Sequence, residues 1–142
     1  MKILNIPVNI TPAQCGRDCH GGAADLTAYL LDPMEETADR LRPAVIICSG
    51  GGYNHLSDRE DQPVAMEYLA AGFQVFCLHY SVAPDVFPRS LMELAMTVHL
   101  IRTHSQEWMV DPKRVVASGF SAGGHLACGL GAFYNQEFLY GP

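Results

Sequence analysis

Short apolar runs and helical repeats alternate along the chain. Lys2–Ile10 and Asp25–Leu31 alternate loosely between polar and apolar residues, which predicts two half-exposed strands paired as a hairpin. Three further runs are mostly apolar and of strand length, a pattern typical of strands buried on both faces of a parallel sheet: Ala44–Cys48, Phe73–Tyr80 and Arg114–Ser118. We therefore expect a sheet in which antiparallel and parallel strands are combined.

Helix patterns separate the later strands. Asp58–Ala71 is expected to be helical, with Pro63 near its start. A second helix opens at Pro88, and its apolar residues recur at helical spacing to about Trp108. A third begins at Ala122 and is rich in small residues that allow close packing on a sheet. The order predicts an α/β fold of three layers, with two antiparallel strands at one edge, then parallel strands with helices on both faces.

Charge and hydropathy exclude several classes of partner. The formal net charge of −6 disfavours nucleic acid and anionic membrane surfaces. No apolar run approaches the roughly 20 residues of a membrane span, and the N-terminus lacks the apolar stretch of a signal peptide. These features predict a cytoplasmic protein.

The cysteines indicate neither disulfides nor a metal site. They are odd in number and scattered, and three of them fall inside apolar runs, so we expect them to be reduced and buried; the five are Cys15, Cys19, Cys48, Cys77 and Cys128. Cys15, Cys19 and His20 could begin a metal site, but no second ligand pair follows at the spacing that zinc requires. No metal and no cofactor are expected.

The segment Gly119-Phe-Ser121-Ala-Gly123 carries the clearest chemical signal. It has the form G-x-S-x-G and joins a predicted strand directly to a predicted helix, which is where a nucleophilic serine sits in many hydrolases. Small residues at 119 and 123 allow the tight turn, and the start of the helix favours negative charge. The alternative is a glycine-rich turn with an idle serine, because the pattern also recurs by chance.

A second glycine-rich segment follows the third predicted strand. Acyl transfer places negative charge on a carbonyl oxygen, and preorganised backbone amides stabilise that charge. Glycines let such amides approach the substrate, so Gly50 and Gly51, with Gly52 next, are candidates for an oxyanion hole together with the amide of Ala122. A merely flexible loop is the other interpretation.

Four segments resemble a known family. Ser49–Tyr53, Tyr80–Pro84, Val110–Arg114 and Gly119–Ala127 are similar, in order and spacing, to the α/β-hydrolase esterases, particularly the acetyl esterase and acetylxylan esterase-like branch related to hormone-sensitive lipase. The resemblance runs from about residue 44 to 128 and covers the N-terminal half of that fold. Residues 1–142 are therefore expected to be the N-terminal part of a single α/β-hydrolase domain, truncated after the nucleophile helix.

The resemblance implies a function and a set of site residues. It implies Ser121 as the nucleophile, the amides of Gly50, Gly51 and Ala122 as the oxyanion hole, and hydrolysis of a small-molecule carboxylic ester with a short acyl group such as acetyl. Tyr53 and His55, close behind the glycines, and Gly52 are expected to line the substrate entrance. The chain departs from the family at Ser49, where relatives often carry His or Pro, and at Ser81, where an Arg usually follows the Tyr.

The acid and base of a serine triad are not evident. In such hydrolases an Asp or Glu and then a His follow the serine along the chain, and here only His125 and Glu137 are candidates. His125 lies one helical turn beyond Ser121, with no carboxylate placed to orient it. We therefore expect little or no activity from these residues alone. The strand before Ser121 should form a sheet edge that a second copy or a C-terminal half covers.

Two further functions compete with the esterase. A non-catalytic binding or assembly module could keep the scaffold without the triad. A serine peptidase of the same fold is a weaker alternative, because nothing in the sequence points to recognition of a peptide terminus.

Overall fold

The computed structural model describes residues 1–11, 14 and 24–140, and their fold is built on one five-stranded sheet. In space the strands follow the order β1-β2-β4-β3-β5. Along the chain they are β1 (Lys2–Val8), β2 (Ala24–Leu30), β3 (Arg42–Cys48), β4 (Gln74–His79) and β5 (Val110–Gly119).

Strand directions agree with the sequence pattern. β1 pairs with β2 in an antiparallel hairpin, and β2 is also antiparallel to β4. β3 lies parallel to both β4 and β5. The prediction of an antiparallel edge followed by parallel strands is therefore confirmed. Of the described strands, β5 closes the sheet on the other side, and the prediction that something covers this edge stays a prediction.

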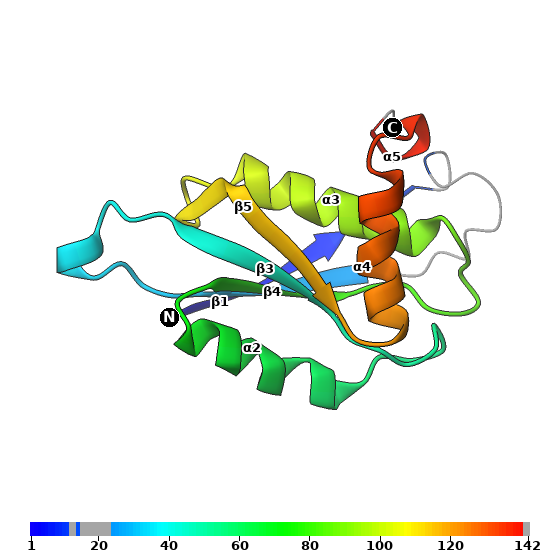
Figure 1. The fold of residues 1–142 in the computed structure, drawn as a ribbon, viewed down its shortest axis with the longest axis horizontal. Helices are drawn as coiled ribbons and strands as arrows, with labels where there is room; N and C mark the ends of the chain where they lie inside the picture. Colours follow the sequence, from blue (N-terminus) through cyan, green and yellow to red (C-terminus); the bar gives the residue numbers. More distant parts are fainter. Residues whose placement is uncertain (12–13, 15–23, 141–142) are drawn as a thin grey trace.

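Helices lie on both faces of the sheet. Figure 1 shows α2 (Gln62–Ala70) on one face and α3 (Arg89–Thr103) with α4 (Ala122–Phe133) on the other. A short α5 (Glu137–Tyr140) packs against α3, and two single turns of 3-10 helix, η1 (Glu35–Thr37) and η2 (Asp58–Glu60), lie in the connections.

The two faces bury separate cores. Between the sheet and α3 and α4 lie residues such as Ile46, Phe76 and Leu94, all fully buried. The opposite face packs Val45 and Val75 against α2. β3 and β4 contribute to both cores, which explains why their sequences are continuously apolar.

Most predicted bounds agree with the structure to within about two residues, but three elements differ by more. The helix expected over Asp58–Ala71 is divided into η2 and α2 at Asp61, whose backbone is not helical. The second helix ends at Thr103 rather than Trp108, because the following turns fold the buried Trp108 back onto Phe76, with ring centroids 5.5 Å apart.

The last strand also begins earlier than predicted. β5 starts at Val110 and passes through Pro112, where its pairing with β3 is interrupted by a register shift between Arg42 and Ala44. An edge strand tolerates such a bulge and a proline, since its outer side needs no ladder hydrogen bonds.

The expectation that the cysteines are buried holds for two of the described residues and fails for a third. Cys48 and Cys77 are buried as expected, and burial raises the pKa of the Cys48 thiol to about 12. Cys128 is exposed, which corrects the expectation, because it lies on the open side of α4. Cys15 and Cys19 lie outside the described residues.

The described residues contain neither a cluster suited to a metal ion nor a helix suited to a membrane. Within the described part of the chain no group of three or more His, Cys, Asp or Glu side chains could hold a metal ion. In that same part no helix has the length and apolar character needed to cross a bilayer.

Candidate active site

Ser121 occupies a sharp turn between β5 and α4. Its φ is 51° and its ψ is −114°, a conformation that non-glycine residues rarely adopt and that stores strain. The side chain is exposed at the N-terminus of a helix of 12 residues, where unpaired amides and the helix dipole favour negative charge. The turn thus presents the hydroxyl as a nucleophile elbow would.

Two glycines make this turn sterically feasible. A Cβ on Gly119 would lie 2.6 Å from the amide nitrogen of Gly124, and a Cβ on Gly123 would lie 2.6 Å from the carbonyl oxygen of Ser49. Both clashes are with backbone, which cannot move aside as a side chain can. Glycine at 119 and 123 is therefore required by close approach of α4 to the strands.

The triple-glycine segment lies directly beside the serine. A Cβ on Gly50 would sit 3.3 Å from the Cβ of Ser121 and 2.7 Å from the carbonyl oxygen of Phe120. The Phe120 amide also donates to the carbonyl of Cys48 at 3.1 Å, which ties the elbow to the end of β3. Segments some 70 residues apart in the sequence are thus brought together at the carboxyl ends of β3 and β5.

The three glycine amides are not equivalent. The Gly50 amide donates to Glu60 Oε2 at 2.6 Å, so it is already bonded within the protein. Gly51 and Gly52 have φ of 143° and 64°, and their amides have no partner among the hydrogen bonds of the described residues. The Gly50 amide is therefore engaged, and the assignment of Gly50, Gly51 and Ala122, the first residue of α4, to an oxyanion hole stays a prediction.

Tyr53 and His125 form a polar pair near the elbow. The Tyr53 hydroxyl and His125 Nδ1 are 2.7 Å apart, and the Tyr53 ring packs edge-on against Tyr80 with centroids 6.0 Å apart. Burial raises the pKa of Tyr53, which keeps its hydroxyl neutral. In the part of the chain that the structure describes, no carboxylate hydrogen-bonds His125, so nothing here orients it as a general base.

A cavity of about 590 Å³ opens next to these residues. Gly52, Tyr53 and His125 line one side of it, and mostly apolar residues of the β4–α3 loop, α3 and α4 line the rest, including Phe87 and Phe133. Ser121 is not part of the lining. His55 is not either, although it was expected to line the entrance; its exposed position follows the glycine turn, where its amide donates to the Gly51 carbonyl at 3.3 Å.

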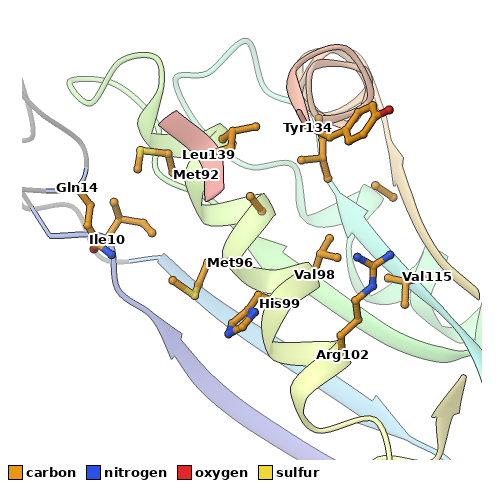
Figure 2. Close-up of a pocket in the computed structure, with 13 residues that line it drawn as sticks. Ile10, Gln14, Met92, Met96, Val98, His99, Arg102, Val115, Tyr134 and Leu139 are labelled. Atoms are coloured by element: carbon orange, nitrogen blue, oxygen red, sulfur yellow. The ribbon is translucent and has the colours of Figure 1, made fainter. Parts of the chain in front are cut away.

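A second cavity of the same volume lies between α3 and β5 and is also bordered by α4, α5 and Ile10 (Figure 2). Apolar side chains such as Met92 and Met96 line it, with His99 and Arg102 as polar members. Of its described lining residues none is a serine, cysteine or carboxylate, so it offers no nucleophile for acyl transfer.

A buried ionic cluster lies below the first cavity, and the sequence did not reveal it. The amide and hydroxyl of Ser81 donate to the carboxylate of Glu93 at 2.7 and 2.6 Å, and Arg89 Nε lies 3.4 Å from Glu93 Oε2. Burial raises the pKa of Glu93, while Ser81 and Arg89 act in the opposite direction. The Arg89 Nε also lies 3.3 Å from the Ser81 hydroxyl, so one buried cluster joins the loop after β4 to the start of α3.

A second polar cluster was also missed. His79, at the end of β4, lies between Asp25 Oδ1 at 3.1 Å and Asp61 Oδ1 at 3.2 Å. The hydrogen bond with Asp61 raises the pKa of His79 and lowers that of Asp61. The expectation of a scaffold histidine fits these contacts, but its two partners come from distant segments that no local pattern joins.

Comparison with known proteins places this geometry in a family. The family model BD-FAE matches residues 30–141, which include the glycine segment and the serine elbow. The structure of MGS-M1, an α/β hydrolase enzyme from a Medee basin deep-sea metagenome library, is similar with 37% identity and a TM-score of 0.80, over 92% of this chain and 50% of that one. The carboxylesterase Cest-2923 of Lactobacillus plantarum is similar with 32% identity and a TM-score of 0.84, over 99% of this chain and 50% of that one.

One curated relative is named as an esterase. An acetylxylan esterase of Xylanibacter ruminicola is 28% identical over 85 residues, which is 59% of this chain and 18% of that protein. The chain therefore spans about half the length of the similar solved structures and less than a fifth of this curated relative. The predicted fold is confirmed by these structures, and the match over most of the chain shows that it belongs to the BD-FAE family of α/β hydrolases.

Proposed function

We propose that this chain carries the nucleophile and oxyanion hole of a carboxylic ester hydrolase that acts on short acyl esters such as acetyl esters. The observation that carries the proposal is the strained Ser121 turn at the start of α4, packed against Gly50. The acetylxylan esterase among the relatives supports acetyl as the acyl group.

The chemistry follows from the residues at this turn. Ser121 Oγ attacks the ester carbonyl and forms an acyl–oxygen bond, while its proton passes to a base and then to the departing alcohol. The carbonyl oxygen becomes negative in the tetrahedral intermediate, and the amides of Gly51, Gly52 and Ala122 are the donors that we assign to it. Water then cleaves the acyl–serine bond and releases the acid.

The general base and its acid are assigned to the portion of the relatives that this chain does not span. His125 is engaged with Tyr53 and has no carboxylate partner among the described residues, which argues against it as the base. Without a base Ser121 is an ordinary alcohol near neutral pH. The residues described here should therefore retain only the oxyanion contribution to catalysis.

Labelling with a fluorophosphonate probe tests this proposal. The longest natural form of the protein that contains these residues should be labelled at Ser121, and the 142-residue chain alone should be labelled far more slowly. Ser121→Ala should abolish labelling, whereas Ser90→Ala, which changes a serine that lines the cavity, should not. If the longest form stays unlabelled, the esterase proposal is wrong and a non-catalytic binding module becomes the better interpretation.

A further inference from the structure

We infer that Glu60 is a positioning residue for the oxyanion hole, holding the Gly50 peptide so that the amides of Gly51 and Gly52 face the reacting carbonyl. The inference rests on the proposed function, because it concerns the same site. It assigns a role to a carboxylate ten residues beyond the glycine segment, in a turn that carries no recognised motif.

Gly50 is clamped between Glu60 and the elbow. Glu60 Oε2 accepts the Gly50 amide at 2.6 Å, and a Cβ on Gly50 would lie 2.9 Å from that oxygen and 3.3 Å from the Cβ of Ser121. A hydrogen bond to an ionised acceptor at this distance is stronger than one between neutral groups. Glu60 thus sets the position of the glycine segment relative to the nucleophile.

The same turn also holds the other side of Gly50. The Ser57 amide donates to the Gly50 carbonyl at 2.9 Å, so residues of a single turn fix both polar groups of Gly50. The Gly50 carbonyl and the Gly51 amide belong to one peptide unit. Accepting a bond at the carbonyl polarises that unit and makes the Gly51 N–H a better donor.

The segment that carries Glu60 is itself anchored to the sheet. Its next residue, Asp61, bonds to His79 at the end of β4, and His79 also contacts Asp25 at the start of β2. Next to the glycine segment, the Tyr80 hydroxyl donates to the carbonyl of Ser49 at 2.5 Å. The glycine segment is therefore held directly by Glu60 and Ser57, and the turn that carries them is linked through Asp61 and His79 to the sheet.

Glu60 is not assigned a direct part in the reaction. A negative carboxylate near a developing oxyanion opposes its formation, so charge alone would make this residue unfavourable. Its contribution has to come from geometry, since a misplacement of about 1 Å at a reacting centre can reduce the rate roughly a hundredfold. This reasoning separates Glu60→Gln, which keeps an oxygen acceptor, from Glu60→Ala, which removes it.

The test measures two properties in the longest natural form of the protein. The first is the rate of fluorophosphonate reaction at Ser121, resolved into the maximal rate and the half-saturating concentration. The second is hydrogen exchange at the amides of Gly50 and Gly51. Glu60→Ala should lower the maximal rate about 10- to 100-fold, leave half-saturation unchanged and speed exchange at Gly50. Glu60→Gln should recover most of the rate that Glu60→Ala loses, because its amide oxygen still accepts the Gly50 N–H.

Asp58→Ala provides the matched control. Asp58 is an exposed carboxylate in the same turn, and no hydrogen bond of its side chain occurs among the described residues, so its removal should change neither readout. An unchanged maximal rate in Glu60→Ala, or equal losses in Glu60→Ala and Glu60→Gln, overturns the inference. If Glu60→Ala does not fold, Glu60→Gln and exchange at Gly50 decide. Failure of the unmodified protein to react refutes the proposed function instead, while exchange still tests the clamp.

Discussion

Two glycines of α4 should respond in opposite directions to the same substitution. Gly123 is the second residue of the helix and lies against the end of β3, whereas Gly131 has open space where a Cβ would point. Replacing each by alanine adds one methyl group to one helix. The difference in unfolding free energy between the variants therefore isolates the contact with the sheet.

The structure gives the expected magnitudes. A Cβ on Gly123 would lie 2.6 Å from Ser49 O and closer still to Cys48 O, inside the 3.0 Å limit that real Cβ contacts respect. Since both neighbours are backbone, α4 has to retreat by something on the order of 1 Å, and overpacking of this kind costs about 3 kcal/mol. Gly131→Ala should instead stabilise by about 0.5–1 kcal/mol, because alanine is the better helix former.

Urea unfolding followed by circular dichroism measures both values. Gly123→Ala should also lose fluorophosphonate reaction at Ser121 as the elbow moves, while Gly131→Ala should react as the unmodified protein does. A Gly123→Ala variant at least as stable as the parent would refute the reasoning. It would mean that α4 does not approach β3 as closely as described.

Two further predictions concern the elbow and the histidine cluster. Ser121→Gly should raise the unfolding free energy by about 1 kcal/mol while ending probe reaction, because glycine adopts φ of 51° without the strain that serine bears. The control Ser118→Gly, on β5, should instead destabilise the protein. If Ser121→Gly brings no gain in stability, the assigned strain is wrong. The pKa of His79 is raised in the folded protein. Its ion pairs therefore stabilise the fold fully below the pKa of an ordinary histidine, about 6.5, and this stabilisation is lost as the pH rises through the pKa of His79 in the folded state. The lowered pKa of Asp61 preserves the pair down to about pH 4. Urea unfolding should therefore show that His79→Gln costs most between about pH 4 and pH 6.5 and less as the pH rises above that range. A pH-independent cost for His79→Gln would show that the charge is not involved.

Local sequence was sufficient for the framework of the fold. Continuous apolar runs predicted β3 and β4, since strands covered on both faces need apolar residues at every position. The serine elbow was also evident, because a tight strand-to-helix turn requires small residues at fixed spacing. Boundaries set by distant packing were missed, as where the helix before Trp108 ends early so that the indole reaches Phe76.

The candidate site likewise combines features that the sequence predicted with features that it did not. The sequence by itself determined that Ser121 and a run of glycines follow two buried strands, which is enough to propose acyl transfer. Only the tertiary structure decided that β3 and β5 are neighbours and that Glu60 occupies the Gly50 amide, while the amides of Gly51 and Gly52 have no hydrogen bond among the described residues. The physical reason is that motifs arise from local backbone constraints, whereas hydrogen-bond partners across tens of residues depend on how strands are ordered in the sheet.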